Sequence, residues 1–158
     1  MTFDPIDLKL IALLEADARI SFADLAEQVA LSKTPCWNRV KALEEAGVIR
    51  GYGARLDTTA LGFDLEAFVQ ISIDIEQSHA FEAAVQRHPL IRSCHATTGE
   101  ADYLLHIMAS DMVALDDLLR EAISRLPGVK RTVTSMSTRA IKTHVSLAAA
   151  HKARTKFT

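Results

Sequence analysis

One stretch near the amino end combines side chains suited to contacting nucleic acid. Asn38 is the only asparagine of the 158-residue chain, Trp37 is the only tryptophan, and Arg39 and Lys41 are basic residues beside them. Reading the major groove of DNA requires an exposed helix face that offers amide or guanidinium groups to base edges and cations to phosphates. These residues favour such a face, and the alternative is an ordinary solvated helix.

The spacing of apolar residues predicts that this stretch is a helix over about 33–46, and Gly47 is expected to end it. Successive residues of a helix point 100° apart, so the side chains divide into two faces. The face expected to lie against the core carries Cys36, Val40, Leu43 and Gly47. The face expected to meet solvent carries Thr34, Asn38, Lys41 and Glu45.

A second candidate site lies in the middle of the chain, where Thr98-Gly99-Glu100-Ala101-Asp102-Tyr103 separates two strand-like segments. Gly99 permits close approach of the backbone to a ligand, and the carboxylate of Asp102 suits the ammonium group of an amino acid. The alternative is a tight turn in which Gly99 supplies a special dihedral angle and Asp102 caps the turn.

The common signatures of enzymes and metal sites are absent from the sequence. It contains no P-loop, dinucleotide fingerprint, Gly-x-Ser-x-Gly or His-Glu-x-x-His motif, and its six histidines lack zinc-ligand spacing. His95 and His106 approach each other if their strands pair, but a structural role is expected for both. We therefore expect no metal and no cofactor. Cys36 is expected to be a buried, inert thiol, and Cys94 is a candidate for redox sensing.

Composition indicates a globular protein, because 49% of the residues are hydrophobic and 24% are charged. The amino end resembles no targeting signal, so we expect a cytoplasmic protein with free thiols and no membrane partner. The net charge of -2 averages over unlike segments. Residues 1–31 sum to -4, residues 32–56 sum to +3, and the eight charged residues after Glu121 are all basic. The basic segment coincides with the candidate helix.

The first part of the chain predicts a helix-turn-helix arrangement. A helix over 5–16 begins after Asp4 as cap with Pro5 in its first turn, and Ser21 caps a short second helix. Ser32 and its neighbours are expected to supply capping oxygens for the third helix. Residues 48–56 alternate loosely and contain two glycines, which suits a small wing or connecting strand.

The second part predicts a ferredoxin-like βαββαβ domain, so the expected fold class is α+β with a winged helix-turn-helix in front. Strands are expected at about 65–75, 91–97, 103–109 and 129–147, and helices at about 79–87 and 111–125. The expected domains are 1–56, a linker over 57–64, the sheet domain over 65–147 and a frayed basic tail over 148–158.

A four-stranded sheet with both helices on one side leaves its other side uncovered. The run Phe68-Val69-x-Ile71-x-Ile73 would then expose apolar surface unless a second sheet covers it. We therefore expect a two-fold dimer, which also matches a palindromic operator.

Residues 31–44, followed by Gly47-Val48-Ile49-Arg50-Gly51-Tyr52, strongly resemble the Lrp/AsnC (feast/famine) family of transcription regulators. The resemblance spans about residues 5–147. It continues in Asp17-Ala18-Arg19-Ile20-Ser21, in Gly99-Glu100-Ala101-Asp102-Tyr103-Leu104-Leu105 and in Leu126-Pro127-Gly128-Val129. The sequence departs from the family at Glu100, where aspartate is common, and at Ser135 and Ser137, where some members carry larger side chains.

The resemblance implies a regulator that binds double-stranded DNA, responds to an amino acid or related metabolite, and assembles from homodimers, often into octamers. The residues expected to contact DNA are Ser32, Lys33, Thr34, Trp37, Asn38, Arg39 and Lys41. The effector residues implied, some contributed across a dimer contact, are Gly99, Glu100, Asp102, Tyr103, Met112, Ser135, Met136 and Ser137. The alternatives are a tetrapyrrole decarboxylase-like enzyme and a small-molecule sensor that does not bind DNA.

Overall fold

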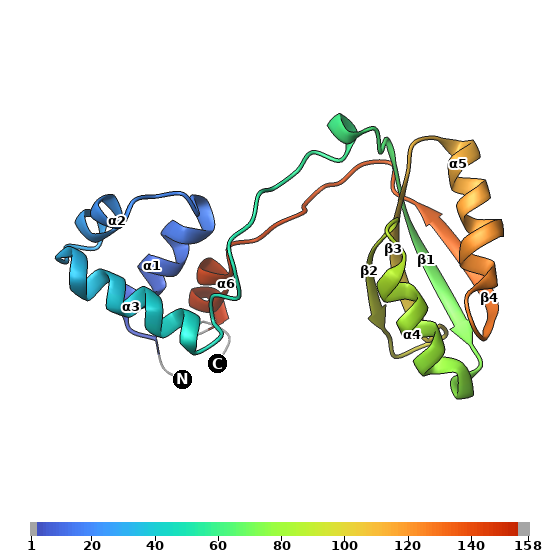
Figure 1. Cartoon of the computed structure of the whole chain (residues 1–158), viewed down its shortest axis with the longest axis horizontal. Helices are drawn as coiled ribbons and strands as arrows, with labels where there is room; N and C mark the ends of the chain where they lie inside the picture. The colour runs from blue at the N-terminus through green and yellow to red at the C-terminus, as the bar shows by residue number, and fades with distance from the viewer. Residues whose placement is uncertain (1–2, 155–158) are drawn as a thin grey trace. The chain divides into compact units, whose positions relative to one another are not determined.

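A computed structural model describes residues 3–154 and divides the chain into two units (Figure 1). The helical unit comprises the described residues up to Arg55 together with those from Ile141 onward, and the sheet unit is Leu56–Ala140. Among the residues described, no helix is long and apolar enough to cross a membrane.

Three helices form the helical unit's core, as the sequence predicts: α1 (Pro5–Ala16), α2 (Phe22–Gln28) and α3 (Lys33–Glu45). Asp4 caps α1 and Ser21 caps α2 by accepting backbone N–H groups. Each helix contributes side chains to one apolar cluster, which includes Leu10, Leu25, Ala26, Val29, Cys36 and Val40. This shared cluster fixes the helix-turn-helix arrangement because each helix can bury its apolar face only against the other two.

The expected wing is not a strand. The structure assigns no regular structure to residues 50–57. A lone strand leaves its backbone groups unpaired, and this segment is held by side chains instead. Tyr52 donates to Glu44 of α3 at 2.7 Å, and Arg55 donates to the carbonyl of Glu15 at 3.2 Å.

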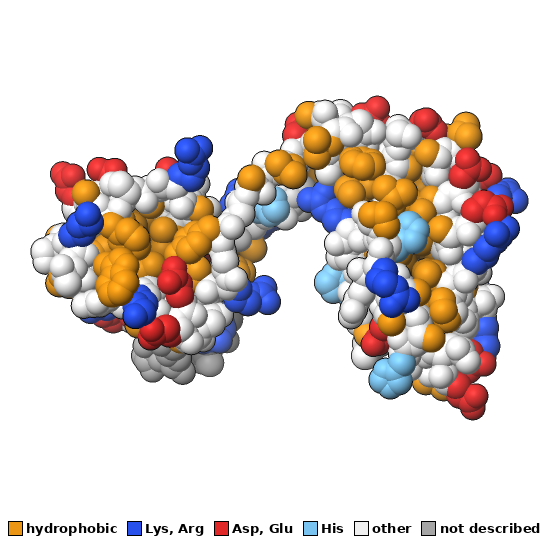
Figure 2. All heavy atoms as spheres, viewed as in Figure 1, with side chains coloured by type: hydrophobic (Ala, Val, Ile, Leu, Met, Phe, Trp, Pro, Cys, Tyr) orange, Lys and Arg blue, Asp and Glu red, His pale blue; other side chains and the backbone are white. Residues whose placement is uncertain are grey.

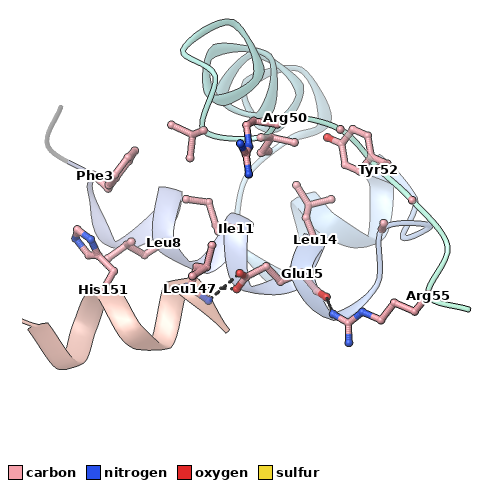
Figure 3. Close-up of a pocket in the computed structure, with 16 residues that line it drawn as sticks. Phe3, Leu8, Ile11, Leu14, Glu15, Arg50, Tyr52, Arg55, Leu147 and His151 are labelled. Atoms are coloured by element: carbon pink, nitrogen blue, oxygen red, sulfur yellow. Dashed lines mark hydrogen bonds between the residues drawn. The ribbon is translucent and has the colours of Figure 1, made fainter. Parts of the chain in front are cut away.

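The prediction of a frayed tail over 148–158 is also wrong for the residues that the structure describes. Residues Leu147–Arg154 form helix α6, which packs on α1, and residues 155–158 lie outside the described residues. The amide of Leu147 donates to the carboxylate of Glu15 (Figure 3), as do the amide of Ala148 and the hydroxyl of Ser146. Ala148 is the buried residue of α6, so α6 extends the helical unit.

The sheet unit has the predicted βαββαβ order. Its strands are β1 (Leu65–Ile73), β2 (Ile91–Ala96), β3 (Tyr103–Ala109) and β4 (Val129–Met136). They form one antiparallel sheet in the order β2-β3-β1-β4. Helix α4 (Ser78–Arg87) follows β1, and the helical stretch after β3 runs from α5 (Met112–Asp117) through a π-helical turn to Arg125.

The last strand is shorter than predicted. The expected strand over 129–147 ends at Met136, where its pairing with β1 ends, and residues 137–146 contain neither helix nor strand. From Ile141 onward the chain belongs to the helical unit rather than to the sheet.

The two faces of the sheet differ from the prediction in one respect. Val69, Ile71 and Ile73 point toward the helices and are buried, so they do not expose apolar surface. Phe68 points to the other face and is 40% exposed, stacked on His106 with ring centroids 4.7 Å apart. Alternation along a strand makes this division unavoidable. The uncovered face therefore mixes apolar and polar side chains.

Candidate functional site

Helix α3 presents the face that the sequence predicts. Cys36, Val40 and Leu43 are buried, whereas the opposite side exposes Thr34, Trp37, Asn38 and Lys41. These exposed positions are spaced i, i+3, i+4 and i+7, so they form one continuous stripe. The stripe offers hydroxyl, amide, aromatic and cationic groups to whatever lies against the helix.

Within this stripe the cation is held over the aromatic ring. Lys41 Nζ lies 5.1 Å from the centroid of the Trp37 ring, and Lys41 also pairs with Glu45 at 3.5 Å. Trp37 is 46% exposed. Both contacts are on the helix surface, where each contributes at most about 1 kcal/mol. They restrict the positions of the ammonium group without burying it.

At the amino end of α3, Ser32 and Lys33 are exposed. Ser32 occupies the N-cap position, but its hydroxyl makes no capping hydrogen bond, which differs from the predicted capping role. The Ser32 carbonyl accepts from the Cys36 amide at 3.2 Å, so the backbone alone begins the helix. The two side chains lie beside the first-turn N–H groups, which attract anions.

Arg39 is placed differently from the other candidates. Its Nη1 donates to Asp4 Oδ2 at 2.6 Å and to Asp7 Oδ1 at 2.7 Å, across to the beginning of α1. Charge-assisted bonds of this length hold the guanidinium on α1. Arg39 therefore lies on the flank of the exposed stripe with its charge already paired.

Figure 2 shows Lys and Arg side chains on the helical unit interspersed with Asp and Glu, so this face is not uniformly basic. The expectation of a basic stretch over 32–56 is met by composition, but two of its five basic residues, Arg39 and Arg55, bond to groups of α1. A surface of mixed charge limits attraction to DNA at long range and leaves more of the discrimination to contacts.

In the sheet unit, the loop after β2 is anchored to the end of β1. Asp102 Oδ2 accepts the Ile73 amide at 2.8 Å, and the Asp102 amide donates to the Ile71 carbonyl at 3.0 Å. Thr97 closes the loop by donating its amide to the Asp102 carbonyl at 2.9 Å. The carboxylate of Asp102 thus has a structural partner, as the tight-turn alternative expects, while its second oxygen accepts no hydrogen bond from the described residues.

Gly99 has a φ of 141°, in the region that favours glycine, and no atom would crowd a Cβ there. Glu100 is exposed, and its carbonyl accepts from the Ser72 hydroxyl at 3.4 Å. The loop is therefore open on the side away from β1. That opening leaves room for a ligand at the loop backbone.

Tyr103 belongs to the core more than to the loop surface. It is 7% exposed and packs on Phe81 with ring centroids 4.7 Å apart. Its hydroxyl donates to Glu82 Oε1 at 2.7 Å, and this bond, together with burial, raises the pKa of Tyr103 to about 12. The hydroxyl is neutral and already bonded to Glu82, so Tyr103 supports the loop from the core side of the sheet.

The other four effector candidates lie at the opposite end of the sheet. The amide of Ser137 donates to the carbonyl of Glu66, seven residues from Ile73 along β1. At about 3.3 Å per residue, roughly 23 Å separates that bond from the one that anchors Asp102. Met112 is on the same side as Ser137, because it follows β3 beyond Ala109, which pairs with Leu65. One chain does not bring the two groups of residues together.

The remaining reactive side chains show no active centre. No group of three or more histidine, cysteine, aspartate or glutamate residues in the described chain could hold a metal. Cys36 is buried, and burial raises the pKa of Cys94, with a further increase from the charge of Glu82. A raised pKa disfavours the reactive thiolate, and redox sensing by Cys94 stays a prediction. His106 Nε2 is buried, 3.3 Å from Glu66.

Sequence reasoning missed Glu15 and the acidic pair at the start of α1. Partial burial works to raise the pKa of Glu15, but its hydrogen bonds from Ser146, Leu147 and Ala148 outweigh this and lower it. A groove of about 500 Å³ lies beside these contacts, lined by Leu8, Ile11, Arg50, Leu147 and His151 among others (Figure 3). Only the spacing of acids along α1 could have signalled these positions, and it does not name their distant partners.

Comparisons with known proteins agree with both units. Residues 66–147 match the family described as the Lrp/AsnC ligand binding domain, and residues 3–50 match a winged helix-turn-helix DNA-binding family. The leucine-responsive regulatory protein of Rhizobium meliloti (strain 1021) is 38% identical over 142 residues, covering 88% of this chain and 91% of that protein. The protein of the same name from Escherichia coli (strain K12) is 42% identical over 134 residues, covering 83% and 82%.

Among solved structures, a transcriptional regulator from Neisseria meningitidis in complex with L-Met is 35% identical, with a TM-score of 0.90. The match covers 96% of this chain and 99% of that one. An AsnC family transcriptional regulator from Agrobacterium tumefaciens is 31% identical with a TM-score of 0.83, covering 89% and 94%. With the helix-turn-helix, the four-stranded sheet and these matches together, the chain belongs to the Lrp/AsnC family of DNA-binding transcription regulators.

Proposed function

We propose that α3 enters the major groove of operator DNA with Thr34, Asn38 and Lys41 toward the duplex, and that Ser32 and Lys33 meet the phosphates beside it. The exposed stripe on α3 carries this proposal. Asn38 supplies an amide that can pair with a base edge, and Lys41 supplies a cation for the backbone. Trp37 keeps the ammonium of Lys41 over its ring, on the same side of the helix.

Two variants test this assignment on DNA selected by the protein from a random pool. Asn38→Ala should weaken binding by about 1–3 kcal/mol and relax the preference at one base position. Lys41→Ala should weaken binding to all sequences alike and lower the slope of log affinity against log salt by about 1. Wild-type affinity in both variants would show that another surface binds the DNA.

For the sheet unit we propose an amino-acid effector, held by Gly99, Glu100 and Asp102, with Tyr103 fixing the loop from behind. Relatives support this class of ligand, because one is named leucine-responsive and another was solved with L-Met. The free oxygen of Asp102 can accept the ligand's ammonium group. Met112, Ser135, Met136 and Ser137 of a second copy complete the site.

The distance between the two groups of effector residues in one chain supports a second copy. A two-fold axis perpendicular to the strands sets opposite ends of two sheets beside each other, so the loop of one protomer meets the far end of β4 in its partner. The mixed apolar face with Phe68 and Val133, which are 40% and 41% exposed, gives such a pair a surface to bury. Larger assemblies, up to octamers, would be built from these dimers.

Asp102→Asn tests the effector site because asparagine keeps an oxygen for the Ile73 amide while losing the charge. Thermal-shift screening of the twenty amino acids first identifies a ligand, with L-Leu and L-Met as starting probes. Asp102→Asn should then remove the effect of that ligand on DNA binding while effector-free affinity stays near wild type. Asp117→Asn, an exposed acid on α5, is the control. An unchanged response midpoint would place the pocket elsewhere.

We further propose that the protein acts in the cytoplasm, where chromosomal DNA is reached, and that it has no enzymatic activity. The exposed stripe of α3 favours DNA binding over the decarboxylase-like and sensor-only alternatives. A visible absorption spectrum of the purified protein, together with a mobility shift on DNA from its own gene's upstream region, separates the three. Light scattering that found 17.3 kDa particles at micromolar concentration would contradict the dimer.

A further inference from the structure

Unlike its neighbours on the exposed stripe of α3, Arg39 directs its side chain to the start of α1. Its guanidinium Nη1 bonds Asp4 at 2.6 Å and Asp7 at 2.7 Å, side chains that are 35 and 32 positions away in the sequence. The side chains of Arg39 and Asp7 are only 35% and 20% exposed. The bond to Asp7 is therefore the better shielded of the two, because the side chain of Asp4 is 43% exposed and solvent screens its contact.

Asp4 and Asp7 are also held in place by bonds to each other's backbone amides. Asp4 Oδ1 accepts the Asp7 amide at 2.8 Å, and Asp7 Oδ2 accepts the Asp4 amide at 3.2 Å, which makes a reciprocal capping box at the start of α1. Their remaining oxygens take the two bonds from Arg39. Arg39 therefore joins α3 to a rigid turn, not to a mobile side chain.

The contact of Arg39 with α1 matters because of the residues that lie beside Arg39 on α3. Asn38 precedes it on the exposed stripe, Val40 follows it in the core, and Lys41 returns to the stripe. Apolar packing at Cys36, Val40 and Leu43 holds one face of α3 against the core, and the bonds from Arg39 to α1 add a restraint on its rotation. A 20° rotation would move groups at the helix surface by about 2 Å, which is enough to break a base contact.

We propose that Arg39 is a positioning residue of the DNA-reading surface: clamped by Asp4 and Asp7, it fixes the rotation of α3 and does not bind DNA itself. This rests on the proposed function, in which Asn38 and Lys41 contact DNA. Arg39 acts through α3, and Asp4 and Asp7 act through Arg39.

Two variants with opposite changes of charge separate positioning from phosphate contact. Arg39→Gln removes a positive charge, and Asp7→Asn removes a negative one while keeping an oxygen for the Asp4 amide. Affinity of the full-length protein is measured for DNA selected by the wild type and for random duplex DNA, each over a series of salt concentrations. Both variants should lower the ratio of specific to non-specific affinity about tenfold and leave the salt slope unchanged.

A phosphate contact by Arg39 predicts a different pattern. Arg39→Gln would then lower affinity for both DNAs and reduce the salt slope by about 1, while Asp7→Asn would raise both affinities. A purely structural ion pair would lower the unfolding temperature of both variants without changing the affinity ratio. Either result would overturn the proposal.

Further variants serve as controls for these measurements. Arg39→Lys retains a cation that can reach the acids, so it should recover most of the specificity, and it covers the case in which Arg39→Gln does not fold. Arg19→Gln and Glu27→Gln change exposed charges of each sign, and both should leave the affinity ratio unchanged. Lys41→Ala in the same assay tests the proposed function separately, because only it should lower the salt slope.

Discussion

Removing the carboxylate of Glu15 should release α6 from the helical unit. This side chain accepts three hydrogen bonds at the amino end of α6, from the Ser146 hydroxyl at 2.7 Å and from the amides of Leu147 and Ala148 at 2.8 and 3.3 Å. It therefore does from another helix what an N-cap residue does within its own. Loss of a cap costs about 0.5–2 kcal/mol, and loss of a negative charge at the positive helix end costs about 0.3–1 kcal/mol more.

These contributions make the undocked state of α6 roughly four- to 140-fold more populated in Glu15→Ala, since each 1.4 kcal/mol is a factor of ten. Amide hydrogen exchange of residues 147–150 measures this opening directly, with exchange in α2 as the internal reference. Glu27→Gln, an exposed acid on α2, is the control. Wild-type protection of those amides in Glu15→Ala would show that apolar packing alone holds α6.

The same contact predicts a dependence on pH. Hydrogen bonding holds the pKa of Glu15 below its ordinary value of 4.5, so the folded unit binds this proton more weakly than the unfolded chain does. The stabilisation is fully present above pH 4.5 and is lost as the pH falls through the lowered pKa. Protection of residues 147–150 should stay constant from pH 8 to about 5 and decrease below about 4, and no such decrease should occur in Glu15→Ala.

Three further changes probe other contacts. Phe81→Ala should destabilise the sheet unit by about 3–5 kcal/mol in denaturant unfolding, because Phe81 is fully buried in its core; a loss below 1 kcal/mol would contradict that role. Gly128→Ala should also destabilise, since a Cβ there would lie 2.6 Å from Gln77 Cβ at a φ of +74°, and an unchanged melting temperature would refute this crowding. Trp37→Phe should weaken DNA binding by less than about 1 kcal/mol in a titration, because phenylalanine holds the Lys41 ammonium less well.

The elements could be predicted from the sequence because local signals agree with burial. Pro5 and Asp4 mark the start of α1, and β3 begins and ends at the residues expected, Tyr103 and Ala109, because strict alternation buries every second side chain. The end of β4 could not be predicted, because residues 137–147 remain compatible with a strand by composition and only the loss of pairing with β1 ends it. The same reason applies to residues 50–57, which pair with no strand in the part of the chain that the structure describes.

For the candidate sites, the exposure of a helix face could be predicted from the sequence, but the bonding partners of individual charged residues could not. A face of a helix follows from a 3.6-residue period, so the exposure of Thr34, Asn38 and Lys41 could be derived from spacing alone. Whether an individual charge is available could not, because an arginine that binds phosphate and an arginine that binds Asp4 and Asp7 are the same residue type. Asp102 poses the same problem, since one oxygen accepts the Ile73 amide and the other accepts no hydrogen bond from the described residues.

Helix α1 bonds to two other helices, to α3 through Arg39 and to α6 through Glu15, and its own composition does not predict this. Its first turn holds the flank of α3 through Asp4 and Asp7, and its last turn holds α6 through Glu15. Each contact joins α1 to a different helix of the same unit. The contact of Glu15 with α6 therefore lies at the end of α1 opposite to the contact of Asp4 and Asp7 with Arg39. Measuring the specificity ratio in Glu15→Ala therefore tests whether the two contacts are energetically coupled, and additivity with Asp7→Asn would show that they are not.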